Sequence, residues 1–426
     1  MSAPSIAIIG SGPSGCYMAQ ALRRHWAESE IAIFDRLPVP YGLVRYGVAP
    51  DHPGTKAVTR QFERMFEREH IHFVGNAEIG KTISLEALRA AFDIVVVATG
   101  LHGDRPLGVE GDDAVRVYGA GRVTRLLNDH PDEIGFKPSF GKRPVIVGNG
   151  NVAIDVLRLL AKSATDFHGS EVSEESLAQL AAHEIEEVHI VGRSPAVQAK
   201  FDTVMIRELS KLQDVHFVVS PDSVLGDATD PTQFAKLEAI LDLTAVERPK
   251  TGRRIVFHFG WTPKSIKTSG DDTVILDVSE SRGTAVKTIE GSSLITAVGF
   301  QESANSSLER CSIAGPAVEL ENGVLDKNLF CAGWYRRGPT GTIPENRNDA
   351  KKVAEHIVSS WSENGSPKKG LPSIAQFLTN TVSYQGWQSI DREELAAAPE
   401  GRQRRKIRDI ATMLKTAQEK NSGDQS

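Results

Sequence analysis

The sequence predicts an α/β protein whose parallel strands are covered on both faces. Short runs of consecutive apolar residues recur along the chain, typically followed by glycine and then by a helix-like stretch. Strands that are apolar on successive residues suit a parallel sheet buried on both of its faces. The clearest runs are residues 5–10, 31–35, 92–100, 144–148, 187–192 and 294–299.

Length and composition indicate a globular protein with more than one domain. The chain has 426 residues, of which 40% are hydrophobic and 24% are charged. Its net charge of −6 offers no electrostatic reason to bind nucleic acid or an anionic membrane. Because we find neither a basic leader nor an apolar run long enough to span a bilayer, we expect a cytoplasmic protein with neither kind of partner.

A glycine-rich turn follows the first strand-like run. In "IAIIGSGPSG", Gly10, Gly12 and Gly15 have the G-x-G-x-x-G spacing. The first glycine permits a tight turn, the second lets a pyrophosphate approach the backbone, and the third lets the helix pack closely on the strand. Asp35, at the end of the next strand, is placed to hold a ribose 2′-hydroxyl. The pattern predicts a dinucleotide site, with a glycine turn that binds no ligand as the alternative.

A second glycine-rich turn opens a second unit. In "VIVGNGNVAIDVLR", Gly148, Gly150 and Ala153 have the G-x-G-x-x-A spacing, an accepted variant. The next strand ends in Arg193, where the first unit has Asp35. A guanidinium attracts a ribose 2′-phosphate that a carboxylate would repel, so this unit is predicted to bind NADP. The alternative for Arg193 is a solvated loop arginine.

The two units resemble each other in design. Residues 6–100 and 145–299 each begin with a glycine turn and end with an apolar run that closes in glycine. This repeat predicts two Rossmann-like dinucleotide-binding domains, with an amphipathic helix inserted at residues 171–184 of the second. Two nucleotide sites in one chain imply that one cofactor stays bound and accepts a hydride from the other. FAD is the natural choice for the bound cofactor.

At this level of detail the chain resembles the adrenodoxin-reductase type of ferredoxin–NADP(+) reductases. The resemblance runs from about residue 5 to about residue 415. It rests on five segments in order: "GSGPSG", "PYGLVRYGVAPDHPGTK", "VGNGNVAIDVLR", "VGRS" followed by "FDTVMIREL", and "CAGWYRRGPTGTIPENRNDA". "APDHP" and "GWYRRGPTG" are the most specific, because a dinucleotide fold does not require them.

The resemblance implies a FAD domain formed by residues 1–103 and 301–426, with an NAD(P) domain at 104–300 inserted between its halves. It also implies that electrons pass from NADP(H) to FAD and then singly to a ferredoxin or similar small iron–sulfur protein, with NAD(H) as a possible second donor. Cys16, Cys311 and Cys331 lie far apart and form no C-x-x-C, so no cluster or redox disulfide is expected in this chain. The cluster is expected in the partner.

The resemblance further implies which residues contact the cofactors. Trp334, Gly341 and Ile343 match positions that line the flavin ring, although Trp334 could simply be core. Asn151 and Val152 match contacts to the NADP pyrophosphate. The expected cofactor-binding residues are Gly10, Gly12, Pro13, Gly15, Asp35, Gly42, Leu43, Gly100, Gly148, Gly150, Asn151, Val152, Arg193, Ser194, Trp334, Gly341, Thr342 and Ile343. No metal ligand is expected.

Two polar residues match positions near the site of hydride transfer. They are His52, in "APDHP", and Glu208, in "IREL", and their expected role is to orient the nicotinamide and tune nearby protons. The alternative for His52 is a loop histidine that caps backbone groups. The alternative for Glu208 is a helix-surface carboxylate beside Lys211.

The chain departs from the family pattern at two positions. Ser194 replaces a second arginine directly after Arg193, and Met205 replaces a glutamate that is often present. Losing one charged contact to a phosphate typically costs about 1.5–3 kcal/mol. We therefore expect weaker discrimination between NADPH and NADH than in a relative with two arginines.

Two basic runs stand out in an otherwise acidic chain, at residues 247–254 and 400–408. Either could steer an acidic ferredoxin, but we favour a basic hairpin loop for the first and a solvated helix face for the second. The alternative enzyme class is an NAD(P)H-dependent diaphorase or monooxygenase-like flavoprotein with another acceptor. The non-enzymatic alternative is a redox-sensing NADP-binding protein.

Overall fold

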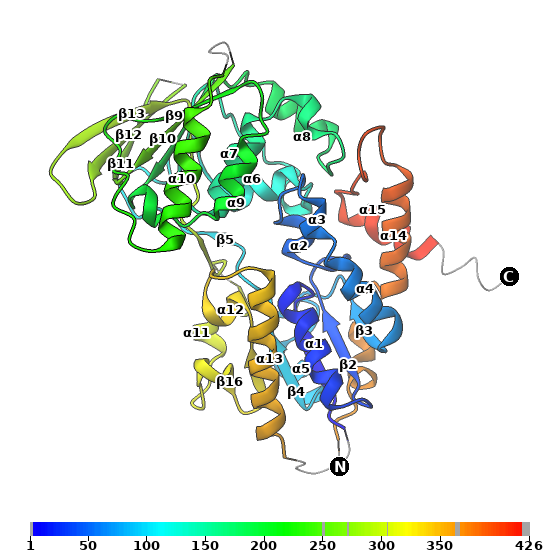
Figure 1. Ribbon diagram of the computed structural model, residues 1–426. Coiled ribbons are helices and arrows are strands. Elements are labelled where there is room, and N and C mark those ends of the chain that lie inside the picture. The colour runs from blue at the N-terminus through cyan, green and yellow to red at the C-terminus, as the bar shows by residue number, and fades with distance from the viewer. Residues whose placement is uncertain (1–2, 249–251, 271, 305, 363–366, 420–426) are drawn as a thin grey trace. The chain divides into compact units, whose positions relative to one another are not determined.

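The computed structural model describes residues 3–248, 252–270, 272–304, 306–362 and 367–419 (Figure 1). The chain divides into two compact units. The first consists of Met1–Gly103, Asn128–Ile134 and Phe300–Ser426, and the second of Asp104–Leu127 and Gly135–Gly299. The two ends of the chain therefore build most of the first unit, and the middle of the chain builds the second.

A six-stranded sheet forms the centre of the first unit, in the order β16-β17-β4-β1-β2-β3. All neighbours are parallel except β16, which is antiparallel to β17. The strands are β1 (Ile6–Ile9), β2 (Ile31–Phe34), β3 (Ile71–Val74), β4 (Ile94–Val97), β16 (Val324–Asp326) and β17 (Leu329–Cys331). Strand β17 is the point at which the C-terminal part of the chain joins the N-terminal sheet.

Helices and turns cover both faces of this sheet. Along β1, Ile6 and Ile8 belong to one apolar cluster with residues of α1, α13, α14 and α15, whereas Ala7 and Ile9 belong to a second cluster with residues of α5. The helices are α1 (Pro13–His25), α2 (Leu43–Tyr46), α3 (Pro53–Lys56), α4 (Thr59–Arg68), α5 (Leu85–Ala91), α11 (Arg310–Ile313), α12 (Trp334–Arg337), α13 (Ile343–Ser360), α14 (Tyr384–Ala396) and α15 (Ile410–Glu419), with 3₁₀ turns at Pro131–Glu133, Leu320–Asn322 and Leu371–Phe377.

The second unit contains a parallel six-stranded sheet in the order β6-β14-β7-β8-β10-β9. Its strands are β6 (Val117–Gly119), β7 (Pro144–Val147), β8 (Glu187–Gly192), β9 (Val215–Val219), β10 (Arg253–Phe259) and β14 (Ser293–Thr296). Its helices are α6 (Ala120–Leu127), α7 (Asn151–Ala161), α8 (Glu174–Ala181), α9 (Thr203–Leu209) and α10 (Pro231–Ala245), with 3₁₀ turns at Ala164–Phe167 and Ala196–Gln198. Helices α6, α7, α9 and α10 cover one face.

The other face of the second sheet is covered by a three-stranded antiparallel sheet, which the sequence did not predict. Its strands are β11 (Trp261–Ser269), β12 (Thr273–Glu280) and β13 (Val286–Gly291). Alternate residues of β12 are buried against the larger sheet. A short two-stranded sheet pairs β5 (Gly103–Asp104) with β15 (Phe300–Gln301).

The predicted strands and the inserted helix are confirmed. Each of the six apolar runs contains a parallel strand of one of the two large sheets, and α8 lies inside the predicted residues 171–184. The polar residues 420–426 lie outside the described part of the chain. Within the described residues, no helix is both long and apolar enough to cross a bilayer.

The segment Asn128–Ile134 belongs to the first unit, although residues 104–300 were expected to form one domain. Asn128, Asp129 and His130 are almost fully buried, and the His130 ring packs against Tyr46 with 4.6 Å between centroids. The Asn128 side chain donates to the carbonyl of Val48 at 3.1 Å. These buried polar contacts bind the segment to the loop that follows α2.

Glu394 is the centre of a buried charge cluster in the first unit. Its side chain is 0% exposed, and its Oε1 lies 2.5 Å from the guanidinium of Arg45, whose side chain is 4% exposed. Burial alone would lower the pKa of Arg45, but the neighbouring Glu394 carboxylate raises it above its ordinary value. Oε1 of Glu394 also accepts from the N–H of Ile407, and Oε2 lies 3.2 Å from Arg404.

The basic run at residues 400–408 belongs to this cluster, so the predicted solvated helix face is wrong. The segment is irregular. Lys406 is 5% exposed, and its ammonium donates to the carbonyls of Arg45 and Asn128 at 3.3 and 3.2 Å. Arg404 pairs with Asp391 at 2.6 Å. Ion pairs and hydrogen bonds inside the unit therefore occupy most of the positive charges of this run.

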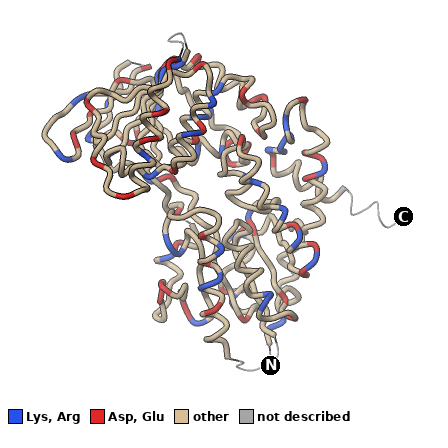
Figure 2. Tube along the Cα trace, in the orientation of Figure 1, with Lys and Arg blue, Asp and Glu red and all other residues tan. Residues whose placement is uncertain are grey.

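The second basic run lies only partly within the described residues. Residues 249–251, the tip of the predicted hairpin loop, fall outside them. Arg253 and Arg254 begin β10, where Arg254 pairs with Glu187 at 2.5 Å and Arg253 donates to the carbonyl of Ala161 at 3.1 Å. Figure 2 likewise shows basic and acidic residues interspersed along the chain.

Replacing Glu394 by Gln should destabilise the protein. The substitution leaves two guanidinium groups without their buried counter-charge, so we expect the free energy of unfolding to fall by about 3–5 kcal/mol. Thermal and urea unfolding of Glu394→Gln would measure this loss. The exposed neighbour Glu393→Gln is the matched control and should leave stability unchanged. Equal stability of the two variants would contradict the prediction.

A chain of polar side chains crosses the interior of the second unit, between its two sheets. Nδ1 of His189 lies 3.0 Å from Nε2 of His258, and Nδ1 of His258 lies 3.1 Å from the Lys287 ammonium. Lys287 pairs with Asp222, and His189 with Glu187, at 2.6 and 2.9 Å. Burial, followed by the charge of Lys287, lowers the pKa of His258 to about 3.

This shift should make the second unit sensitive to acid. Between the ordinary histidine pKa and about 3, His258 binds a proton in the unfolded chain but not in the folded protein. The free energy of unfolding therefore falls as the pH falls through this window. His258→Gln removes this proton-binding group. The slope of the unfolding free energy against pH should therefore decrease by up to about 1.4 kcal/mol per pH unit between about pH 4 and pH 6. Denaturant unfolding at several pH values would measure the slope. An unchanged slope in His258→Gln would contradict the prediction.

Candidate functional site

The carboxyl ends of the parallel strands gather the predicted residues of the first unit at one edge of its sheet. Gly10 follows β1, Asp35 follows β2, and Gly100 lies in the loop after β4. Trp334 follows β17 after two residues. Strands β1 and β4 are neighbours although they are far apart in sequence, so the edge contains the switch point at which open α/β sheets bind ligands.

Two glycines give the first turn its shape. Gly10 has φ +109°, and a Cβ there would lie 2.5 Å from the carbonyl oxygen of Ala98. A Cβ on Gly15 would lie 1.9 Å from the carbonyl oxygen of Gly10, so α1 can begin directly behind β1 only with glycine at this position. Pro13 is the first residue of α1, where its missing N–H costs nothing.

The loop of Tyr41 and Gly42 closes over this turn. The N–H of Tyr41 donates to the carbonyl of Ser11 at 3.1 Å. Gly42 has φ +48°, and a Cβ on it would lie 3.0 Å from the Cα of Gly12. Leu43 then begins α2 and is half-buried. By contrast, a Cβ on Gly12 would meet nothing nearer than 3.9 Å, which leaves room for a ligand at the start of α1.

The Asp35 carboxylate faces the same turn. Its Oδ2 accepts from the N–H and the hydroxyl of Ser11 at 3.0 and 2.5 Å, and its Oδ1 accepts from the N–H of Leu37 at 3.0 Å. A carboxylate offers about four acceptor positions. Asp35 therefore fixes the turn and still has acceptor capacity for a ribose hydroxyl.

The C-terminal part of the chain adds a second helix start beside the first. The Ser14 hydroxyl, in the first turn of α1, donates to Oδ1 of Asn346, in the first turn of α13, at 3.2 Å. The starts of α1 and α13 therefore lie side by side, as Figure 1 also shows. Thr342 caps α13 through a reciprocal capping box with Glu345. Two helix N-termini at one edge favour a negatively charged ligand.

The predicted flavin-ring residues are brought together in the loop before α13. The indole N–H of Trp334 donates to the carbonyl of Gly341 at 3.3 Å, and its ring stacks on Phe300 at 5.5 Å. Gly341 has φ +90°, and Ile343, the first residue of α13, is half-buried. Trp334 is itself only half-buried, so its ring is not simply a core residue.

His52 lies at the start of α3 in the first unit. It occupies the N-cap position, but its side chain makes no capping hydrogen bond there. Its backbone N–H donates to the carbonyl of Ala49 at 3.0 Å, and the imidazole is half-buried. The imidazole therefore does not cap the first turn of α3.

The second glycine turn repeats the first in the second unit. Gly148 has φ +135°, and a Cβ there would lie 2.3 Å from the carbonyl oxygen of Ala297. A Cβ on Gly150 would meet only the Cβ of Lys200, at 3.9 Å. Asn151 begins α7, and its amide group exchanges two hydrogen bonds with Asp202, at 2.6 and 2.8 Å.

The loop after β8 contains the predicted 2′-phosphate residues. Arg193 is exposed directly after β8. The Ser194 hydroxyl accepts from the Asn149 side chain at 3.0 Å, which ties this loop to the glycine turn. Val152 and Met205 are half-buried and pack against the apolar core of the unit. Met205 therefore contributes an apolar side chain to this core.

Glu208 lies on α9 and faces α7. Its Oε2 is 3.7 Å from the guanidinium of Arg158, which is 1% exposed and also pairs with Asp155 at 2.7 Å. Glu208 is half-buried, and its observed ion-pair partner is a buried arginine on another helix. His52 belongs to the first unit and Glu208 to the second.

The structure also identifies contacts that the sequence did not suggest. Tyr41 has φ +82°, an uncommon conformation for a residue other than glycine, and its hydroxyl lies 3.2 Å from that of Tyr384. Phe300 stacks on Trp334, and Lys200 faces Gly150. The proline and glycine around Tyr41 signal a turn, but the partners of all three residues are distant in sequence.

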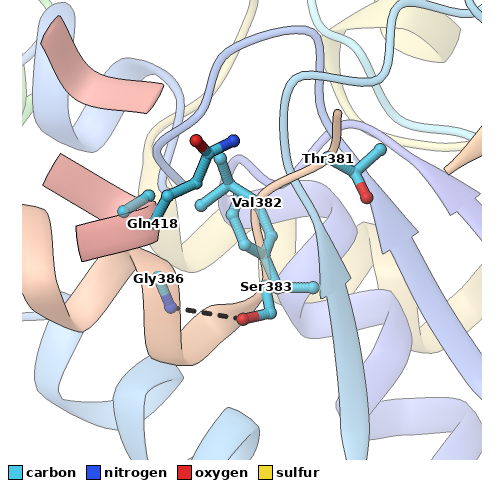
Figure 3. Close-up of a pocket in the computed structure, with 7 residues that line it drawn as sticks. Thr381, Val382, Ser383, Gly386 and Gln418 are labelled. Carbon is cyan, nitrogen blue, oxygen red and sulfur yellow. Dashed lines mark hydrogen bonds between the residues drawn. The ribbon is translucent and has the colours of Figure 1, made fainter. Parts of the chain in front are cut away.

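A small pocket of about 190 Å³ lies elsewhere in the first unit (Figure 3). It is lined by residues of β3, α14 and α15 and of the segment before α14, and Ser383 accepts there from the N–H of Gly386 at 3.2 Å. None of the predicted cofactor-binding residues lines it. It is therefore separate from the glycine turns.

Comparison with known proteins gives a consistent result. A family model described as pyridine nucleotide-disulphide oxidoreductase matches residues 4–224. All three cysteines of the chain are free, so it has no redox disulfide of its own. Cindoxin reductase from Citrobacter braakii is 50% identical over 96% of this chain and 90% of its own length. NADPH-ferredoxin reductase FprA from Mycobacterium leprae is 33% identical over 96% of this chain and 97% of its own.

Solved structures agree with these sequence relatives. Two structures of FprA from Mycobacterium tuberculosis, one of them in complex with NADPH, match with TM-scores of 0.86 and 0.85 at 30% identity. Both matches cover 98% of this chain and 100% of the other. The chain therefore belongs to the adrenodoxin reductase/FprA-type family of NADPH–ferredoxin reductases, flavoproteins that use FAD and NADP(H) and pass electrons to a ferredoxin-type partner.

Proposed function

We propose that the first unit binds FAD and the second binds NADPH. The observation that carries this assignment is the difference between the two glycine turns. Asp35, with acceptors suited to a free ribose, follows the second strand of the first unit, whereas exposed Arg193 holds the same place in the second. A guanidinium attracts a 2′-phosphate, and a carboxylate repels it.

The residues present in each unit fit these cofactors. In the first unit, the open space at Gly12, the closing loop at Gly42 and the paired starts of α1 and α13 would hold the pyrophosphate of FAD. Leu43, Gly100, Trp334, Gly341, Thr342 and Ile343 would line the rest of the flavin site. In the second unit, Gly148, Gly150, Asn151 and Val152 would hold the pyrophosphate of NADPH, with Arg193 and Ser194 at the 2′-phosphate.

The flavin supplies the conversion of a two-electron hydride into single electrons. We propose that His52 contributes a polar group at the nicotinamide, as a positioning residue. For Glu208 the contact with buried Arg158 supports a role in holding α9 against α7. Both would act by orienting the dinucleotide, since hydride transfer takes place between the two cofactors.

The proposed acceptor is a ferredoxin or similar small iron–sulfur protein. One-electron transfer from a flavin suits a single cluster, and this chain has no C-x-x-C to hold one of its own. Free Cys16, Cys311 and Cys331 suit a reducing compartment, and we propose the cytoplasm.

A coupled assay tests this function. The purified protein should be yellow, bleach with NADPH, and reduce cytochrome c rapidly only when a ferredoxin is added. Equally rapid reduction without ferredoxin would favour a diaphorase. Oxygen consumption with hydroxylated product would favour a monooxygenase-like flavoprotein, and a colourless protein that still binds NADP would favour a sensor.

Arg193→Gln should lower the kcat/KM for NADPH by about ten- to a hundredfold and leave that for NADH nearly unchanged, because only NADPH carries the 2′-phosphate. Steady-state kinetics with both nicotinamides would measure this. With Ser194 in place of a second arginine, we expect the unmodified enzyme to discriminate less than a two-arginine relative. A strong preference for NADPH would count against that expectation.

Gly12→Ala should weaken FAD binding without preventing folding. The new methyl group meets no atom closer than 3.9 Å, but it projects where the pyrophosphate would approach the backbone. We expect the FAD dissociation constant to rise by about tenfold or more, which corresponds to about 1.4 kcal/mol. Equilibrium dialysis would measure it. Gly15→Ala, whose Cβ would lie 1.9 Å from a carbonyl oxygen, should instead disrupt folding. Full flavin occupancy with unchanged affinity in Gly12→Ala would refute the assignment.

A further inference from the structure

Lys200 is built into the second glycine turn through its backbone. Its N–H donates to the carbonyl of Asn149 at 3.1 Å, and the residue forms an isolated parallel bridge with Gly150. Its neighbours Ala199 and Phe201 are each 1% exposed. The carbonyl of Ala199 also accepts from Lys236 of α10 at 2.6 Å. The backbone on either side of Lys200 is therefore anchored.

The side chain of Lys200 is exposed, in contrast to its neighbours. Its Cβ lies 3.9 Å from the position that a Cβ on Gly150 would take, so the side chain starts at the mouth of the turn. Within the described parts of the chain, its ammonium makes no hydrogen bond or ion pair. A flexible cation thus stands beside the N-terminus of α7 with its charge uncompensated.

A carboxylate near the start of α7 would oppose phosphate binding unless a cation offset its charge. Asp202 lies within hydrogen-bonding distance of Asn151, the first residue of α7, at 2.6 Å. Its negative charge would repel a phosphate at the start of this helix, although the dipole of α7 would attract one. An ammonium at residue 200 offsets that repulsion.

We infer that Lys200 binds the pyrophosphate of the nicotinamide dinucleotide, whereas Arg193 binds its 2′-phosphate. The inference rests on the proposed function of the second unit. Lys200 faces Gly150, where α7 begins and its free N–H groups lie, whereas Arg193 follows the neighbouring strand β8. The two cations therefore bind different phosphate groups of the dinucleotide. Lys200 contributes equally to NADP(H) and NAD(H) binding, and Arg193 contributes only to NADP(H).

The test is a set of binding titrations on the oxidised holoenzyme, in which binding is measured by the flavin difference spectrum or by calorimetry. NADP⁺ and NAD⁺ are titrated into the unmodified enzyme and into Lys200→Gln, Lys200→Arg, Arg193→Gln and Lys211→Gln. Lys211 is the matched control, because it is an exposed lysine shortly after α9. Unfolding temperatures of all variants would confirm that each is folded.

Lys200→Gln should raise the dissociation constants of NADP⁺ and NAD⁺ by the same factor, about tenfold. Lys200→Arg should restore most of the affinity for both. Arg193→Gln should raise the constant for NADP⁺ alone, and Lys211→Gln should change neither. The dependence of NADP⁺ affinity on salt should also become shallower in Lys200→Gln, since one charge contact is lost.

Two results would overturn the inference. Dissociation constants in Lys200→Gln that stay within about twofold of the unmodified values would show that Lys200 binds no phosphate. A loss of affinity for NADP⁺ alone would indicate that Lys200 binds the 2′-phosphate instead of the pyrophosphate. Failure of the proposed function is distinguishable, because the unmodified enzyme itself would then bind neither dinucleotide.

Discussion

Both glycine turns depend on one steric constraint, the close approach of a glycine to a backbone carbonyl that a side chain would block. In the first unit the backbone of Gly15 lies so near the carbonyl of Gly10 that any side chain would collide with it. In the second, Gly148 presses against the carbonyl of Ala297, which follows β14. Each helix N-terminus therefore opens at the edge where the parallel strands end. The phosphate sites follow from this approach, because the free N–H groups and the helix dipole both point there.

The buried charge cluster around Glu394 extends this constraint to the C-terminal part of the chain. Arg45 lies on α2, the short helix that Gly42 begins, and its side chain pairs with Glu394 while its carbonyl accepts from Lys406. The loop that closes over the first glycine turn is therefore held by residues far along the chain. Buried pairs of this kind cost desolvation and are weak sources of stability, but losing one partner is expensive. Their effect here is to fix α2 in one position.

The sequence predicted what depends on local pattern and missed what depends on distant partners. Apolar runs and glycine spacing were enough for the central strands, both turns and α8, because these features arise from neighbours in sequence. The three-stranded sheet at β11–β13 alternates only weakly, and the basic run at residues 400–408 resembled a solvated face. Its acceptors, Asp391, Glu394 and Asn128, become neighbours only in the fold. The sequence did not indicate a role for Lys200 for the same reason, since Lys200 and Gly150 become neighbours only through their bridge in the fold.

The segment from Arg193 to Glu208 connects the residues proposed to bind phosphate with the residue proposed to orient the dinucleotide. Ser194 and Asp202 are hydrogen-bonded to the glycine turn, and α9 begins at the next residue, Thr203. Glu208, one helix length further, contacts the buried guanidinium of Arg158 on α7. Because α7 itself starts at that turn, the residues proposed to bind phosphate and Glu208 are all connected to α7 or α9. On the proposed function, we therefore expect a substitution that alters phosphate binding in this segment also to affect how the dinucleotide is oriented.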